Sequence, residues 1–467
     1  MRLRFVAFVA VVVGVGLPGV AVARPYEVKN LRVISGPSPF AAGCPGATLD
    51  ETRIAGAEIE PAITVNPADP RNIVATWQQD VGRNASRSDL IGTSGDGGKT
   101  WKRVTIPGLS RCTGGSADSA TDPWVSAGPD GSVYFSGAAL FLSDPLPAVL
   151  VTSRSRDRGR RWSPAVTFAG PSVRVEREVV TADPRRPGHA YVVWWERDPL
   201  MPFVGSTHQF ARTVDGGATW SAPVTLDTAP AGAIDQSAEI LVLPNGSLLA
   251  LTARLQLEGD GALQKLFAMR SPDQGRTWEA PVQVASQPIA PIPDPETGDA
   301  LPNQDLTFHS AAIAPDGAVY VAWDRDSSAS SGTIDIAKSS NGGRSWSAPT
   351  PLPGVTAFTF QPAIAVDARG TVGVVWYDNR NDRLGDAPRT TDVWFAHSAD
   401  GGSSWRHSHV AGPFDLRTAP RPSGDLRLGE YQGLAGLRRG FAAVFTQAAP
   451  QAKNGPTDIF FARIAAR

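Results

Sequence analysis

The chain repeats one eight-residue motif six times, and this repetition constrains the fold more than any other feature. The motif reads Ser/Thr-x-Asp/Asn-x-Gly-x-x-Trp, and its copies end at Trp101, Trp162, Trp220, Trp278, Trp346 and Trp405. Successive tryptophans lie 61, 58, 58, 68 and 59 residues apart. A nearly constant period of this length indicates a repeat architecture in which each repeat is one supersecondary unit.

The composition of the motif indicates a tight turn. Aspartate or asparagine followed by glycine is typical of turns that require a positive φ angle. The carboxylate and the hydroxyl accept backbone N–H groups in such turns, and the tryptophan packs beneath them. We therefore expect the motif acids to stabilise turns and not to form a catalytic ring.

Each repeat contains the same succession of four strands. In the first repeat, apolar runs at 61–67 and 72–77 precede a strand that enters the motif, and a last strand follows at 103–106. Such a four-stranded meander is the blade of a β-propeller. The first strands of successive repeats begin at Pro61, Pro123, Glu178, Ala238, Ser310, Pro362 and Gln432.

The seventh repeat lacks its fourth strand, because the chain ends at Arg467 soon after the third strand at 458–462. The segment 30–36 resembles the fourth strands of other repeats, such as 103–108. Pairing it with the C-terminal strands removes an open sheet edge. The sequence therefore predicts an all-β, seven-bladed β-propeller of four-stranded antiparallel blades, closed by the N-terminal strand; a six-bladed ring is the alternative.

The N-terminus has the pattern of a secretion signal. Basic residues in 1–4 precede an apolar run at 5–17, and Ala21-Val22-Ala23 is a suitable cleavage site. We expect a signal peptide at 1–23, cleavage after Ala23, and a secreted propeller domain at 24–467. An uncleaved membrane anchor is the alternative.

The charge balance argues against some partners. The chain has 44 basic and 45 acidic residues and a net charge of −1, which gives no reason to expect nucleic acid or an anionic membrane surface. No second apolar run approaches the length of a membrane span. We expect a monomer.

The chain has two cysteines, Cys44 and Cys112. An even number in an exported chain favours a disulfide. Both cysteines precede a predicted innermost strand, so they lie near one face. Two separate buried thiols are the alternative.

The motif is similar to the Asp-box, or BNR repeat, and the chain from about Glu60 onward resembles the sialidase superfamily. That resemblance implies a glycoside hydrolase of the exo-α-sialidase type, which acts on terminal, acidic sugars of glycans. The expected partner is then a glycan or sialoside-like substrate.

One predicted face of the propeller carries polar residues at its strand connections. The connections that enter the first strands supply Glu58, Glu60, Asp122, Glu176, Glu178, Asp235, His309, Gln361, Glu430 and Tyr431. The connections that leave the second strands supply Asp80, Glu196, Arg254, Arg325, Tyr377 and Arg380. Arginine suits an anion-binding cleft, because its planar fork binds carboxylates bidentately.

The resemblance assigns roles to some of these residues. The segment Glu430-Tyr431-Gln432 is similar to the sialidase segment that carries a tyrosine nucleophile, so Tyr431 is the expected nucleophile. Glu196, or alternatively Glu178, would draw off its proton, and Asp122, or alternatively Asp80, would be the acid/base.

The substrate-binding residues implied by the resemblance lie on neighbouring blades. Arg254, Arg325 and Arg380 would bind the substrate carboxylate, and Tyr377 and Glu430 would line the site. No cofactor or catalytic metal is expected; the acidic loop 294–299 is either a structural calcium site or a polar surface loop.

A second function remains open. The Phe-Arg-Ile-Pro segment typical of sialidases is missing, and the nearest match, 52–55, comes too early to align. The alternative is a non-catalytic propeller that binds a glycan or a protein partner on its channel face.

Overall fold

The computed structural model describes residues 25–40, 43–44, 52–83, 86–141, 148–169, 174–198, 205–259, 261–289, 291–302, 309–422, 424 and 426–467. The expected signal segment 1–23 lies outside these residues. The described chain is almost entirely β-strand, with single 3₁₀ turns at η1 (Arg111–Thr113) and η3 (Leu416–Thr418). Within these ranges, no helix is long and apolar enough to cross a membrane.

The strands follow one another as four-stranded antiparallel units. The first three units are β2–β5 (Glu58–Val65, Ile73–Val81, Ser86–Ser94, Lys102–Thr105), β6–β9 (Ser119–Ala127, Val133–Leu140, Ala148–Ser155, Val166–Ala169) and β10–β13 (Arg174–Ala182, Ala190–Arg197, Thr207–Thr213, Val224–Thr228). Single pairings between β4 and β6 and between β8 and β10 join these units into one 12-stranded sheet.

The following units form separate four-stranded sheets. They are β14–β17 (Ala233–Val242, Leu248–Glu258, Gly261–Ser271, Val282–Ile289), β18–β21 (Ser310–Ile313, Val319–Ser328, Ser331–Ser339, Thr350–Pro351) and β22–β25 (Thr359–Val366, Val372–Asp378, Thr390–Ser398, Arg406–Asp415). The last sheet contains β26 (Gly433–Gly436), β27 (Phe441–Ala448) and β28 (Thr457–Ala466).

The fourth strand of the last sheet comes from the N-terminus. Strand β1 (Tyr26–Val33) pairs antiparallel with β28, from Tyr26 opposite Ala466 to Val33 opposite Phe460. The sheet order is β1-β28-β27-β26. The N-terminal segment therefore occupies the position that the missing last strand of the repeat left open, although the strand begins earlier than the predicted segment 30–36.

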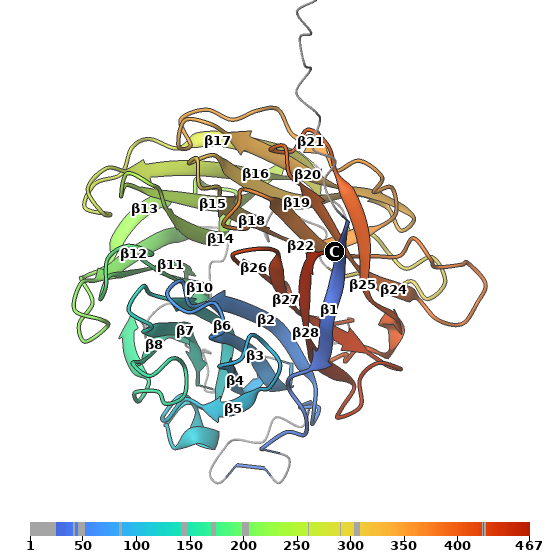
Figure 1. Cartoon of the computed structure of the whole chain (residues 1–467), viewed down its shortest axis with the longest axis horizontal. Coiled ribbons are helices and arrows are strands. Elements are labelled where there is room, and N and C mark those ends of the chain that lie inside the picture. Colours follow the sequence, from blue (N-terminus) through green and yellow to red (C-terminus); the bar gives the residue numbers. More distant parts are fainter. Residues whose placement is uncertain are drawn as a thin grey trace, which may run out of the picture.

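The units are arranged around a common centre (Figure 1). Their first strands lie innermost, and contacts join β2 to β6, β6 to β10, β10 to β14, β14 to β18, β18 to β22, β22 to β26, and β26 back to β2. The core fills the spaces between neighbouring units. Its largest fully buried side chains include the equivalent tryptophans of four second strands, Trp77, Trp194, Trp323 and Trp376.

The repeated motif forms the turn that its composition predicts. The backbone N–H groups of Lys99 and Thr100 each donate to Asp96 Oδ1 at 2.9 Å, and the N–H of Gly98 donates to Ser94 Oγ at 2.9 Å. The indole N–H of Trp101 donates to the Gly98 carbonyl at 3.2 Å. Backbone N–H groups donate in the same way to Asp157, Asp215, Asp273, Asn341 and Asp400. These aspartates and the one asparagine are therefore occupied inside their own turns.

In several copies the motif glycine also packs its turn closely onto the preceding unit. A Cβ atom on Gly98 would lie 2.2 Å from the ring of Phe461 on β28, and one on Gly275 would lie 2.1 Å from Phe210 on β12. Both distances are far below van der Waals contact. The motif glycine is therefore required for close approach between neighbouring units as well as for its positive φ.

This packing predicts a large difference between two glycine substitutions. Gly98→Ala is expected to lower the free energy of unfolding by about 2–5 kcal/mol, because it adds left-handed strain and overpacks Phe461. Gly114→Ala is the matched control: Gly114 has φ +85°, close to the +86° of Gly98, but no atom lies within 4 Å of its added Cβ. Denaturant unfolding measures both, and equal losses would contradict the packing role.

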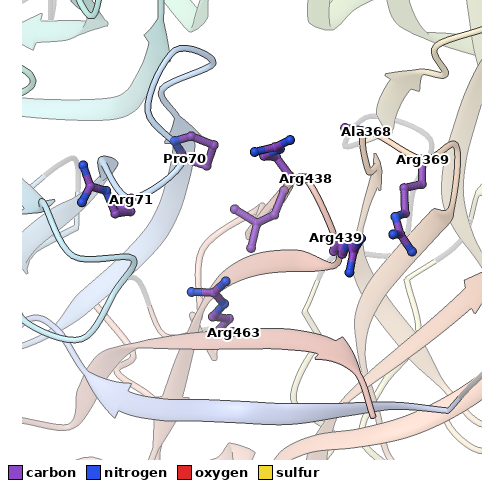
Figure 2. Close-up of a pocket in the computed structure, with 8 residues that line it drawn as sticks. Pro70, Arg71, Ala368, Arg369, Arg438, Arg439 and Arg463 are labelled. Carbon is purple, nitrogen blue, oxygen red and sulfur yellow. The ribbon is translucent and has the colours of Figure 1, made fainter.

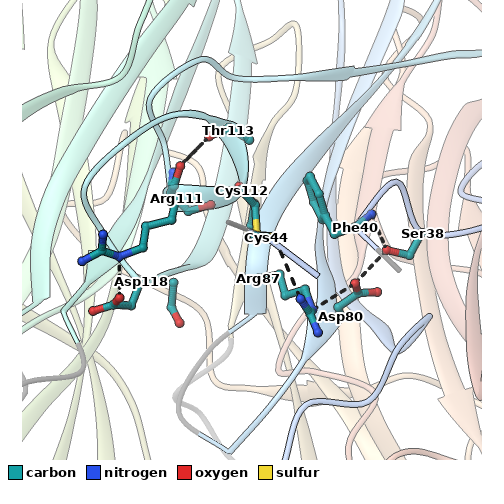
Figure 3. Close-up of a disulfide and its surroundings, with 12 residues drawn as sticks. Ser38, Phe40, Cys44, Asp80, Arg87, Arg111, Cys112, Thr113 and Asp118 are labelled. Carbon is teal, nitrogen blue, oxygen red and sulfur yellow. Dashed lines mark hydrogen bonds and ion pairs between the residues drawn. A yellow bond between two sulfur atoms is a disulfide. The ribbon is translucent and has the colours of Figure 1, made fainter. Parts of the chain in front are cut away.

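A disulfide joins Cys44 and Cys112, with their Cα atoms 4.9 Å apart (Figure 3). It links the segment after β1 to η1, which lies between β5 and β6. Nearby, Asp80 accepts hydrogen bonds from the Ser38 hydroxyl at 2.7 Å and the Gly56 N–H at 2.8 Å. Asp80, the alternative acid of the sequence-based hypothesis, is fully buried and holds this N-terminal segment in place.

Candidate active site

A β-bulge recurs near the start of the innermost strands. The register between the first and second strands shifts at this point in β2, β6, β10 and β22. At each of these bulges one non-glycine residue has a positive φ: Glu60 (56°), Asp122 (57°), Arg177 (58°) and Gln361 (52°). Bulges redirect side chains, and strained residues at equivalent positions are typical of functional sites.

Seven charged or polar residues at this end of the innermost strands form what we call the channel cluster. They are Glu60, Asp122, Glu176, Arg177, Arg427, Glu430 and Tyr431. Asp122 accepts hydrogen bonds from the Thr121 hydroxyl at 2.8 Å and from the Arg177 N–H at 2.9 Å. Asp122 remains half-buried, so its carboxylate is both held in place and partly accessible.

Tyr431 is buried within the cluster. Its hydroxyl donates to the Pro123 carbonyl at 3.2 Å, and the Arg177 guanidinium lies 4.4 Å from the centre of its ring. Burial raises the pKa of Tyr431 well above 10, and the negative charges of Glu60 and Asp122 raise it further. The phenol therefore keeps its proton at neutral pH.

Two glutamates of the cluster retain protons more readily than ordinary carboxylates. Burial, followed by the charges of Glu430 and Asp122, raises the pKa of Glu60 well above its usual range. Burial also raises the pKa of Glu430 to about 7, although Arg427, whose Nη2 lies 3.6 Å from Glu430 Oε1, opposes the shift. Glu430 is about one-third exposed, so it is an accessible proton donor.

A second carboxyl layer lies below the cluster. Glu178 is almost fully buried, and neither of its carboxylate oxygens has a hydrogen-bond partner in the described part of the chain. Burial raises its pKa well above the usual range, as it does for Asp89. The negative charge of Asp122 raises the pKa of both groups further.

Three partly exposed arginines surround Glu176. Arg174 forms an ion pair with Glu176, and the charges of Arg174 and Arg197 oppose the rise in the pKa of Glu176 that burial causes. The charge of Glu176 in turn acts on Arg427. Burial lowers the pKa of Arg427, but the charges of Glu430, Glu60 and Asp122 outweigh this and raise it. Positive charge is thus held at the channel mouth beside the accessible carboxyl groups.

The arginines predicted to bind substrate lie in three separate ion pairs. Arg254 donates to Asp235 and Asp227, both at 2.8 Å. Arg325 pairs with Asp335 at 2.6 Å, and Arg380 binds Asp378 and lies 4.0 Å above the Trp394 ring. Arg325 and Arg380 are paired within their own four-stranded units, and Arg254 also reaches Asp227 on β13 of the neighbouring unit. The contacts of the described residues do not bring the three arginines together.

Two other predicted site residues are also held by local partners. Glu196 accepts from the Trp194 indole at 3.2 Å, whereas the acids whose charges act most on Tyr431 are Glu60, Asp122 and Asp89. Tyr377 is fully buried, stacks on Phe360 and donates to the Thr446 carbonyl at 2.8 Å. Tyr377 therefore belongs to the core between neighbouring units.

Two clusters of acidic residues resemble metal sites in their composition. His208, Asp227 and Asp235 place donor atoms within 4.8 Å of one another, but the guanidinium of Arg254 already binds both carboxylates. In the loop 294–299, Arg417 binds Asp294 and Glu296, and Arg421 binds Asp299. Arginine thus supplies the positive charge in both places.

Sequence reasoning identified all four cluster acids as polar entry residues but did not single out Arg177 and Arg427. A signal for Arg177 was present. It immediately precedes the first strand at Glu178, just as Glu60 precedes Pro61 and Asp122 precedes Pro123. Arg427 lies in an irregular connection between β25 and β26, and it has no equivalent residue in the other repeats from which a role could be predicted.

Comparisons with known proteins give likenesses of structure only. No family model matches the chain, and no curated protein matches it. Among solved structures, a protein of unknown function from Dyadobacter fermentans is 13% identical with TM-score 0.49, covering 95% of this chain and 99% of that one. A Hadza microbial sialidase is 14% identical with TM-score 0.47, covering 95% and 94%.

An α-L-arabinanase from Penicillium chrysogenum, solved with arabinobiose, is 17% identical with TM-score 0.47, covering 75% of this chain and 94% of that one. The assignment of a function to this chain therefore rests on its own side chains.

Proposed function

We propose that this chain is a secreted glycoside hydrolase that removes a terminal, acidic sugar from glycans at the channel cluster. The observation that carries the proposal is that two partly exposed carboxyl groups lie near enough for the charge of Asp122 to raise the pKa of Glu430. Asp122 accepts hydrogen bonds through both oxygens, whereas the pKa of Glu430 is raised to about 7 by burial. Glycoside hydrolysis generally requires such a pair.

In this mechanism Glu430 donates its proton to the glycosidic oxygen as the bond to the leaving group breaks. The Asp122 carboxylate stabilises the oxocarbenium-like transition state and either attacks the anomeric carbon or activates water. Tyr431, the nucleophile expected from the sequence, is less suited to that role. Burial and the nearby acids raise its pKa well above 10, so its hydroxyl is a weak nucleophile at neutral pH.

The proposed preference for an acidic sugar rests on Arg174, Arg197 and Arg427. These arginines take the role that the sequence assigned to Arg254, Arg325 and Arg380. A guanidinium binds a carboxylate through two parallel hydrogen bonds. Arg197 Nε is buried without a hydrogen-bond partner in the described chain, which leaves it able to receive such a group.

We also infer that the four-stranded units are the seven blades of one closed propeller domain. The succession of contacts between innermost strands, which runs from β2 round to β26 and back to β2, supports a closed ring. The pairing of β1 with β28 supports closure by the N-terminal strand. The bulged ends of the innermost strands would then share one channel mouth.

A substrate panel tests the proposed activity. The purified protein is incubated with fluorogenic glycosides of acidic sugars, including sialosides and uronides, and of neutral sugars, including arabinofuranosides. Turnover of an acidic sugar that Arg197→Ala weakens mainly through KM supports the proposal. Tight binding of acidic sugars without turnover of any substrate would instead support the non-catalytic alternative.

The raised pKa of Glu430 predicts a pH dependence. A general acid must be protonated, so kcat/KM is expected to fall as pH rises through about 7. Glu430→Gln should remove this basic limb and lower turnover most for substrates with poor leaving groups. A pH profile on an activated aryl glycoside and on a natural disaccharide measures both effects. A basic limb that persists in Glu430→Gln would exclude Glu430 as the acid.

A further inference from the structure

The opposite ends of the innermost strands carry a second site. The channel cluster lies near the starts of β2, β6, β10 and β26, whereas this site lies at the turns that follow β2, β22 and β26. A pocket of about 660 Å³ is lined by Pro70, Ala368 and Leu437 and by five arginines, Arg71, Arg369, Arg438, Arg439 and Arg463. Figure 2 shows these arginines around one hollow, on turns from different units and on β28.

Most of this positive charge has no local counter-charge. Arg71 pairs with Asp69 at 3.1 Å, but no ion pair involves Arg369, Arg438, Arg439 or Arg463 within the described ranges. The nearby Asp367 is buried, and its oxygens accept the backbone N–H groups of Arg369, Thr371 and Gly440 at 2.9–3.0 Å. Asp367 is therefore used by its turn and does not serve as a partner for a guanidinium.

This concentration of arginine is local, because the whole chain has a net charge of only −1. Arg369, Arg438 and Arg439 are exposed. Guanidinium groups bind sulfate, phosphate and carboxylate oxygens through paired, charge-assisted hydrogen bonds. Several of them around one pocket suit a ligand that carries more than one anionic group.

An adjoining cavity indicates what else the ligand contains. It has a volume of about 500 Å³, shares Pro70, Ala368, Leu437 and Arg438 with the arginine pocket, and is lined further by Pro67, Pro184, Pro244 and Pro315 at equivalent turns. A ligand that fills both would place anionic groups on the arginines and a less polar body against the prolines.

Two classes of anionic partner fit this surface poorly. No aromatic side chain lines either pocket, so the surface lacks the stacking platforms that bind single-stranded nucleic acid. The exposed large hydrophobic residues of the described surface, Leu31, Val166, Val214, Leu257 and Leu384, all lie outside both pockets. The surface therefore also lacks the apolar anchors of a membrane-binding face.

We propose that this face binds an acidic polysaccharide, through sulfate or carboxylate groups on the arginines and sugar rings on the proline-lined floor. The site is separate from the channel cluster and does not depend on the proposed activity. A polyanionic chain held here stays attached to the protein whether or not the channel mouth is occupied.

Binding of dextran sulfate and polygalacturonate, with neutral dextran as the control ligand, tests the proposal. The wild type is expected to bind at least one of the two polyanions, with an affinity that falls as salt is added. Arg438→Ser/Arg439→Ser should weaken binding by about tenfold or more. Arg276→Ser/Arg406→Ser removes the same charge from exposed positions elsewhere and should leave the affinity within about twofold.

Some results of these binding measurements would contradict the proposal. Equal losses in the two double variants would mean that net charge alone causes binding. Stronger binding of a single-stranded oligonucleotide or of phosphatidylserine vesicles, abolished by the same pocket substitutions, would replace the polysaccharide with that partner. Unfolding temperatures within about 2 °C of the wild type confirm that the variants fold, since the changed side chains are exposed.

Discussion

Asp122→Asn is expected to lower kcat by about 10³-fold or more while the protein remains folded. The amide keeps one oxygen to accept the Arg177 N–H, so the bulge in β6 retains a partner. It cannot carry the negative charge that stabilises the oxocarbenium-like transition state. Steady-state kinetics on the most active substrate of the panel measures the loss, and an unfolding curve verifies the fold.

Tyr431→Phe is the discriminating control for this prediction. It removes the hydroxyl that donates to Pro123 but leaves the ring between Trp124 and Arg177. If the two carboxyl groups carry the reaction, turnover falls only modestly. A loss in Tyr431→Phe as large as that in Asp122→Asn would restore the tyrosine nucleophile that the sequence predicts, and full activity in Asp122→Asn would exclude the carboxylate mechanism.

Deletion of residues 25–33 is expected to have the largest effect on stability. Strand β1 covers the edge of β28 along its length. Tyr26 also packs against His397 and Phe441, and its carbonyl accepts the Ser408 hydroxyl at 2.7 Å. The deletion therefore breaks contacts to two sheets, and the loss should exceed the about 3–5 kcal/mol of a large core truncation.

Soluble yield and thermal unfolding measure this effect. Leu31→Ser is the control, because Leu31 is 43% exposed and the change leaves the strand in place. The control is expected to behave like the wild type. A truncated protein with an unchanged unfolding temperature would show that β1 does not close the sheet.

The strand units could be predicted from the sequence because turn chemistry and hydrophobic pattern are local. The Asp96 turn follows from residue types at a repeated spacing. The Cys44–Cys112 disulfide follows from an even number of cysteines in a chain expected to be exported. The extra N-terminal strand also followed, since one repeat was a strand short. The turn and the strand depend on position within a repeat, which the motif fixes.

The site was harder to predict because it depends on register. Arg254 and Asp235 are directly paired across β14 and β15, and Arg325 and Asp335 lie on adjacent strands of one hairpin. Cross-strand neighbours of opposite charge bind each other, so these arginines form local ion pairs instead of converging on one cleft. The bulges that direct Glu60, Asp122 and Arg177 are single-residue register shifts, which composition does not reveal.

The pairing of β1 with β28 also sets the order in which the protein can be completed. Tyr26 lies opposite Ala466, so β1 can pair only after the distant strand β28 is present. Closing so long a loop is entropically costly and slow. Until β1 arrives, β28 has an open edge, and this edge is the part of the fold most exposed to pairing with another chain.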